Sequence, residues 1–409
     1  MILQTRPTGD AVTRPWSFVW LLAASQLVAW GSLYYAFTVA VVPMETELGW
    51  SKTTLNGALS VGLLFWGLTA PLVGAWIDRY GAREVMIAGA VVGGLLMVAW
   101  SQVTSIWAFY AIWAAMGVAM ATLLYEPAFA VVTALYGGDF RRAITAITLL
   151  GGFASTVLIP VTQALTELWG WRHAILAIGV TMAIVCGGLH ALILRKGDGR
   201  APIPHSGGTA KGARVLVDNF GNPVFCGLAL WFTAYGATFT GLTFMLIPIM
   251  TAYDVPTPQI LMVMASIGPM QVGGRIILLA LGRRLSARAT GAFVAAAMAV
   301  SVAILLVAPG YFPALVAFAL LYGTANGMMT IVRGTAVPDY LGDSRYATLN
   351  GALALPVTLA KAISPLALAA LWSSSGSPRA VVMTILAFCI VGVGGYLIAA
   401  LSRHPRNRS

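Results

Sequence analysis

Long, nearly uncharged apolar runs recur along the whole chain and constrain its fold more than any other feature. About 20 apolar residues let a helix cross the hydrocarbon core of a bilayer, and twelve stretches of the chain meet that requirement. Strands of a transmembrane barrel would alternate over about ten residues instead, so the unbroken runs exclude a barrel. The predicted fold class is an all-α integral membrane protein. The expected spans are approximately 16–42, 53–77, 84–103, 107–135, 141–166, 171–194, 222–252, 257–282, 289–308, 312–337, 346–373 and 378–401.

The positive charges indicate how these spans are oriented. With the N-terminus inside, only Lys52, Arg172 and Arg379 of the 24 Lys and Arg residues fall outside, and Arg275 and Lys361 fall within the membrane. Basic residues concentrate in the cytoplasmic loops of membrane proteins. We therefore expect a multi-pass protein of the inner (cytoplasmic) membrane with both termini in the cytoplasm. The net charge of +11 then reflects orientation, and we expect no nucleic-acid partner.

One long polar connection divides the chain. Residues 195–221 are rich in Gly, Pro and charged residues, as flexible linkers are. Six predicted spans precede this connection and six follow it. We expect an N-terminal six-helix bundle in residues 1–194, a cytoplasmic linker in 195–221, a C-terminal six-helix bundle in 222–409, and a monomeric functional unit.

The two sides of the linker resemble each other. The end of the second span, 74–83, corresponds to the end of the eighth, 282–288, and residues 117–141 correspond to 323–345. Weak internal repeats of this kind are typical of secondary transporters, whose substrate site lies near the membrane midplane between the repeats.

Several motifs resemble a known family. The pattern Gly-x-x-x-Asp-Arg-x-Gly-x-Arg at 74–83 resembles the signature loop of the major facilitator superfamily. The stretches at 30–37, 48–51 and 170–172 resemble its monocarboxylate-porter branch and the related oxalate/formate exchangers. The first resemblance implies two pseudo-symmetric six-helix bundles. It also implies gating roles for Asp78, which meets a helix N-terminus, and for Arg79 and Arg83, which hold neighbouring helices. The second implies transport of organic anions.

The eighth span of that branch commonly carries an aspartate four residues before an arginine that binds the substrate carboxylate. The chain keeps the arginine, as Arg275, but has Gln271 where the acid would stand. Proton coupling through that aspartate therefore does not carry over. The oxalate exchangers pair their arginine with a lysine in span 11, which corresponds to Lys361.

Elementary electrostatics leads to the same two cations. Arg275 and Lys361 lie in apolar stretches that contain no carboxylate. A charge at bilayer depth costs about 2.5–3.5 kcal/mol on insertion scales, so it usually faces a polar cavity. An arginine also matches a carboxylate with two parallel hydrogen bonds. We expect an anionic substrate to complete them; the alternatives are an acid on a neighbouring helix for Arg275 and snorkelling for Lys361.

Other candidate residues carry weaker signals. Glu126 is the one carboxylate well inside a predicted span, and Arg333 occupies nearly the same place in the repeated span 10. The pair suits a cytoplasmic gate, while a buried Glu126 alone suits proton coupling. Tyr34, Tyr35, Tyr235 and Asn326 lie on spans expected to line the cavity and are further candidates for substrate binding, with packing or a place in the interfacial belt as the alternative.

The predicted function is secondary active transport of small organic anions, mono- or dicarboxylates, by alternating access. Proton symport and anion exchange both remain open, as do two other classes: a proton-driven exporter of drugs or hydrophobic metabolites, and a non-transporting membrane sensor. The sequence has no phosphate-binding glycine loop, and its four His are isolated. We therefore expect no enzyme activity, no cofactor and no metal.

Overall fold

The computed structural model describes residues 14–200, 221–281, 284–342 and 346–402, which are almost entirely helical. Ten helical stretches in this part of the chain are long and apolar enough to cross a membrane. One of them, Ile106–Ile193, has 88 residues and contains three of the predicted spans, so the ten stretches account for all twelve. The helices are α1 (Trp16–Trp30), η1 (Gly31–Tyr35), α2 (Ala36–Leu48), α3 (Lys52–Tyr80), α4 (Arg83–Ser101), α5 (Ile106–Leu123), α6 (Tyr125–Tyr136), η2 (Gly137–Asp139), α7 (Phe140–Gly151), α8 (Ala154–Ile193), α10 (Pro223–Ala252), α11 (Thr257–Leu281), α12 (Ala287–Val307), α13 (Phe312–Ala336), η3 (Val337–Leu341), α14 (Tyr346–Ser375) and α15 (Pro378–Leu401).

Breaks in the helical ladder fall close to the candidate residues. Span 1 contains the π-helix η1, which carries Tyr34 and Tyr35; such π-turns are frequent at functional sites. Span 4 breaks at Leu124, whose extended backbone separates α5 from α6 just before Glu126. Span 5 breaks at Gly152 and Phe153, between α7 and α8. Irregular backbone at membrane depth is tolerated only where protein or a polar cavity surrounds it.

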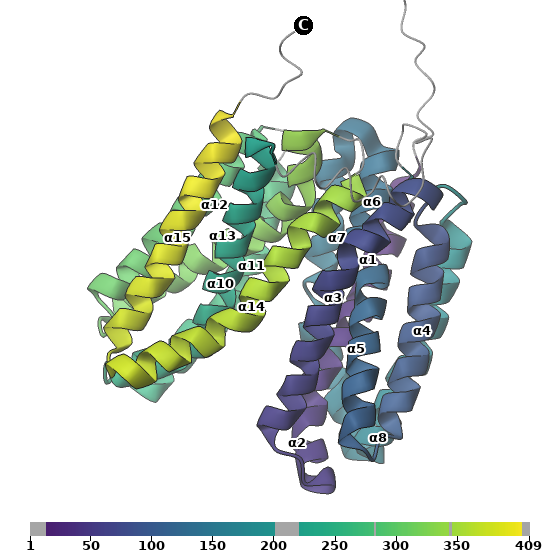
Figure 1. The fold of residues 1–409 in the computed structure, drawn as a ribbon, viewed down its shortest axis with the longest axis horizontal. Helices are drawn as coiled ribbons and strands as arrows, with labels where there is room; N and C mark the ends of the chain where they lie inside the picture. Colours follow the sequence, from purple (N-terminus) through teal and green to yellow (C-terminus); the bar gives the residue numbers. More distant parts are fainter. Residues whose placement is uncertain (1–13, 201–220, 282–283, 343–345, 403–409) are drawn as a thin grey trace, which may run out of the picture.

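The helices form two groups, drawn in purple to teal and in green to yellow in Figure 1. In the N-group, α1 to α8, the closest neighbours include α4 with α8 and α3 with α5; in the C-group, α10 to α15, they include α10 with α15 and α11 with α13. Each group has its own hydrophobic core. The domain boundaries at 194/195 and 221/222 stay predictions, and linker residues 201–220 lie outside the described ranges.

The two groups pack together at the end where α1 begins and α15 ends. Small residues make the approach possible, as in many membrane helix pairs. A Cβ on Gly74 of α3 would overlap the carbonyl oxygen of Ala347 on α14, and a Cβ on Gly67 would lie 2.7 Å from Cβ of Thr358. A third hydrophobic core here joins residues of both groups, including Phe129. Toward the opposite end α3 and α14 diverge (Figure 1), so the described conformation is closed at one end.

Candidate functional site

Arg275 lies where the two groups meet. It belongs to the last third of α11 and is only 7% exposed. Its Nε donates a hydrogen bond of 3.4 Å to Oγ1 of Thr330 on α13. Among the described residues, Arg275 forms no ion pair. The arginine is therefore neither exposed to lipid nor neutralised by a neighbouring acid in the part of the chain that the structure describes.

The break in span 5 makes room for this guanidinium. A Cβ on Gly152 would overlap Nη1 of Arg275, and a Cβ on Gly151 would lie 2.6 Å from the hydroxyl of Tyr125. Gly152 thus lets a side chain of the C-group reach the backbone of the N-group, while Gly151 leaves room for Tyr125 of the N-group itself. No sequence pattern reveals this contact, because it joins residues far apart in the chain.

The described groups around Arg275 are tyrosines and not carboxylates. The hydroxyls of Tyr35, Tyr125 and Tyr235 all interact electrostatically with its charge. Tyr235 donates to the amide oxygen of Asn326, which is 3% exposed. Tyr34 packs edge-on against Tyr35, with ring centroids 5.2 Å apart. Phenolic hydroxyls can donate to an anion without competing with it by charge.

Gln271 lies one turn before Arg275 on α11. Its backbone approaches α13 so closely that a Cβ on Gly327 would overlap the carbonyl oxygen of Gln271, and its side chain is partly buried. The residue helps to set the spacing of α11 and α13, which together hold Arg275 and Thr330.

Lys361 lies on α14 between Pro356 and Pro365. Its ammonium nitrogen is 5.5 Å from the centroid of the Phe239 ring on α10, within the range of a cation–π contact. Lys361 has no ion-pair partner within the described ranges. The charges that it interacts with are those of Arg333 and Glu126. Phe239 was missed by the sequence reasoning, since an aromatic ring in a span reads as packing.

The structure brings Glu126 and Arg333 together across the two groups. The Nη2 atom of Arg333 on α13 is 3.7 Å from Oε1 of Glu126 on α6, and their side chains are 23% and 16% exposed. The other carboxylate oxygen, Oε2, is buried and has no hydrogen-bond partner among the described residues. The nearby hydroxyl of Tyr346 donates to the carbonyl oxygen of Gly334 at 2.7 Å.

Asp78 also joins the two groups. Its carboxylate accepts hydrogen bonds from the backbone N–H groups of Ala347 (3.2 Å) and Thr348 (2.8 Å) at the start of α14. Arg83 holds the end of α8 within the N-group, where Nε donates to the carbonyl oxygen of Leu194 at 2.9 Å. Arg79 is exposed and lies 4.9 Å from the ring of Tyr80 on its own helix, so the expected contact with a neighbouring helix is not seen among the described residues.

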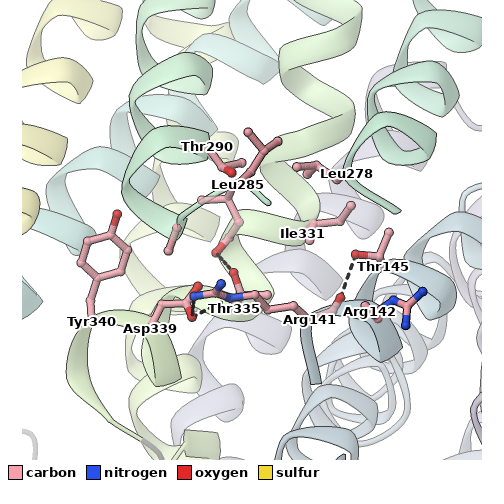
Figure 2. Close-up of a pocket in the computed structure, with 12 residues that line it drawn as sticks. Arg141, Arg142, Thr145, Leu278, Leu285, Thr290, Ile331, Thr335, Asp339 and Tyr340 are labelled. Atoms are coloured by element: carbon pink, nitrogen blue, oxygen red, sulfur yellow. Dashed lines mark hydrogen bonds and ion pairs between the residues drawn. The ribbon is translucent and has the colours of Figure 1, made fainter. Parts of the chain in front are cut away.

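A second ion pair between the groups was missed from the sequence. Arg141 on α7 donates from Nε to Oδ1 of Asp339 on η3 at 2.9 Å, and the Asp339 side chain is only 4% exposed. The pair lines a pocket whose apolar walls include Leu278 and Ile331. Figure 2 shows Arg141 reaching Asp339 while Arg142 points away from the pair. No spacing rule connects residues 141 and 339, so only the packing reveals this contact.

Comparison with known proteins agrees with the fold. Residues 22–311 match the family model described as Major Facilitator Superfamily. Over 140 residues the chain is 31% identical to "Monocarboxylate transporter 12-B" of Danio rerio, which covers 34% of this chain and 29% of that protein. Over 85 residues it is 35% identical to "Probable anion transporter 4, chloroplastic" of Arabidopsis thaliana, covering 20% of this chain and 16% of that protein. These matches span less than a third of each relative.

Solved structures match over almost the whole chain. The human organic anion transporter TETRAN superposes with a TM-score of 0.69 at 19% identity, covering 96% of this chain and 100% of that one. The transporter FucP in its outward conformation gives a TM-score of 0.70 at 11% identity, covering 94% and 99%. At these identities the likeness concerns the fold alone. With a family match over more than half of its length, the chain belongs to the major facilitator superfamily.

Proposed function

We propose that this protein is a secondary active transporter of small organic anions, mono- or dicarboxylates, and that it works by alternating access. One observation carries the proposal: a buried guanidinium at the junction of the two helix groups, surrounded by tyrosine hydroxyls, with no ion-pair partner among the described residues. A buried charge without a partner is costly. A substrate carboxylate would remove that cost and accept two parallel hydrogen bonds.

The relatives support the substrate class. Several are named as monocarboxylate transporters and others as anion transporters, at modest identity over part of the chain. Lys361 supplies a second positive charge, while Tyr34, Tyr35, Tyr235, Gln271 and Asn326 position the substrate. The coupling is either proton symport or exchange against a second anion.

We further propose that the protein resides in the cytoplasmic membrane with both termini inside, as the distribution of basic residues favours, and that the monomer is the functional unit. The end at which the two groups are in contact is then the cytoplasmic end. Asp78, Arg79, Arg83, Glu126 and Arg333 belong to the gate at this end, which must open to release substrate. The described conformation is in that case the outward-facing one.

Counterflow into proteoliposomes tests the proposed function. Oxalate, succinate and lactate would be offered with and without a pH gradient. Arg275→Ala should lower the affinity for the transported acid by about 30-fold or more, because losing one partner of a buried charge pair costs about 2–5 kcal/mol. Arg379→Ala, an exposed arginine at the start of α15, is the matched control and should transport normally.

Full uptake by Arg275→Ala would refute the assignment. The competing exporter hypothesis predicts instead that hydrophobic cations, and not carboxylates, are moved and stabilise the purified protein. Dependence of uptake on an inward proton gradient would separate symport from exchange.

A further inference from the structure

The contact between Glu126 and Arg333 is loose for an ion pair inside a membrane protein. Its distance of 3.7 Å exceeds the roughly 2.7–2.9 Å of a charge-assisted hydrogen bond. The Oε2 atom of Glu126 is buried without a partner in the described part of the chain. By contrast, the Arg141–Asp339 pair makes two hydrogen bonds between the same two helix groups. Glu126 is therefore a weakly held counter-ion.

Arg333 lies on the same face of α13 as the groups around Arg275. Asn326, Thr330 and Arg333 are spaced by four and three residues, which places them one above another on a helix. Asn326 accepts from Tyr235, and Thr330 accepts from Arg275. The hydroxyl of Tyr235 interacts electrostatically with both Arg333 and Arg275. Thr330, which binds Arg275 of α11, thus lies about one helical turn before Arg333 on α13, and the two arginines border the same face of that helix.

The charges in this region do not balance. Arg275, Arg333 and Lys361 are three cations, and Glu126 is the one carboxylate that the described structure pairs with any of them. Two positive charges remain, which is the charge that a dianion would neutralise.

We propose that the substrate is a dicarboxylate whose second carboxylate replaces Glu126 as the counter-ion of Arg333, while its first carboxylate binds Arg275. The inference rests on the proposed function and specifies its substrate class. It also assigns Arg333 to substrate binding, and it makes Glu126 a competitor of the substrate carboxylate for Arg333. Lys361, the other cation that interacts with Glu126, then balances the displaced carboxylate.

This exchange couples binding to movement. Opening the closed end separates α6 from α13, and with it Glu126 from Arg333. In the empty protein that movement leaves Arg333 without a counter-ion in a poorly solvated place. With a dicarboxylate bound, Arg333 stays neutralised as the groups separate. The substrate therefore lowers the barrier to opening through its different affinity for the two states, which is what a ligand needs to shift an equilibrium.

The inference predicts opposite changes in dicarboxylate affinity when Glu126 and Arg333 are substituted one at a time. Binding of oxalate, malonate and succinate, with lactate as the monocarboxylate, would be measured by titration of the purified full-length protein. Glu126→Gln removes the competitor, so the affinity for the best dicarboxylate should rise about tenfold. Arg333→Gln removes the binding charge, so that affinity should fall about tenfold or more, while lactate binding changes less than about threefold. A merely structural ion pair predicts the same direction for both variants.

The Arg141–Asp339 pair supplies the matched control. It also joins the two groups, at a pocket that neither Arg275 nor Arg333 lines. Arg141→Gln and Asp339→Asn should change dicarboxylate affinity in one shared direction, since both only weaken the closed end.

Two results would overturn the inference: weaker dicarboxylate binding in both Glu126→Gln and Arg333→Gln, or equal losses for succinate and lactate in Arg333→Gln. Should Arg333→Gln fail to fold, the direction of change in Glu126→Gln alone decides, and Arg333→Lys, which keeps the charge, should recover part of the affinity. If Arg275→Ala abolishes transport while the pair gives changes of equal sign, only this inference fails. If Arg275→Ala transports normally, the proposed function fails as well.

Discussion

Gly152 occupies the place where an arginine from the other helix group needs room. Without a side chain, it lets the guanidinium of Arg275 lie against the backbone at the break between α7 and α8. Its neighbour Gly151 does the same for the hydroxyl of Tyr125. The position of the guanidinium thus depends on the absence of a methyl group at Gly152, and a shift of even about 1 Å in a binding group can be costly.

We expect Gly152→Ala to weaken carboxylate binding about tenfold without unfolding the protein, because the new Cβ would displace Nη1 of Arg275. Gly188→Ala is the control, since a Cβ on this helical glycine of α8 meets no atom within 4 Å. The control should bind as the parent does and be equally or slightly more stable. Titration calorimetry and thermal unfolding measure both properties. Unchanged affinity in Gly152→Ala would mean that Arg275 has freedom that the packing does not indicate.

At the scale of whole elements, the carboxylate of Asp78 holds the start of α14. Four N–H groups at a helix N-terminus lack partners within the helix, and the helix dipole makes this end attractive to an anion. Asp78 at the end of α3 satisfies two of these groups, those of Ala347 and Thr348. The same two helices approach through Gly67 and Gly74. The α3–α14 contact therefore combines close packing with a capping interaction supplied by a different helix.

Asp78→Asn should shift the conformational equilibrium away from the closed end by about 1–2 kcal/mol, because the amide keeps the shape but loses the charge that the helix dipole favours. Distances between spin labels on loops at the closed end would report the shift as a larger open population. Glu84→Gln is the comparison, since the one ion pair of Glu84 within the described ranges is an exposed contact of 3.8 Å with its neighbour Arg83. An identical distance distribution in Asp78→Asn and the parent would contradict the capping role.

At the scale of the molecule, every ion pair and carboxylate–backbone contact described between the groups lies toward one end. Asp78 with α14, Glu126 with Arg333 and Arg141 with Asp339 all contribute. α3 and α14 diverge toward the opposite end (Figure 1). A transporter that alternates must break these contacts in each cycle, so each one has to be weak enough to be exchanged.

Tying the closed end together should therefore stop transport. In a chain whose Cys186, Cys226 and Cys389 are replaced by Ser, a short reducible thiol cross-linker between Arg141→Cys and Asp339→Cys would join the two groups where these side chains are in contact. Cross-linking should abolish counterflow, and reduction should restore it. The control pair Glu47→Cys and Arg172→Cys joins α2 to α8 within the N-group, where Nε of Arg172 lies 2.7 Å from Oε1 of Glu47, and its cross-linking should leave transport intact.

Much of the fold was predictable from local sequence. The apolar runs, the repeat and the loop at 74–83 predicted an all-α membrane protein of the major facilitator superfamily, and the family match confirms it. Arg275 could also be identified as a candidate from its own segment, because a charge within an apolar run is conspicuous whatever its spatial neighbours are. The match of Glu126 to Arg333 came from the repeat. Their roles in binding, gating and coupling stay predictions.

The sequence by itself determined which segments cross the membrane and which charges lie among them, because the cost of burying a charge or an unpaired backbone group depends only on the segment and its surroundings of lipid. Tertiary structure alone decided which of those charges meet. Gly152 lies against Arg275, Phe239 faces Lys361 and Asp339 holds Arg141 because helices distant in the chain pack side by side. Such contacts carry no periodicity or spacing, so they arise only once the helices have taken their places.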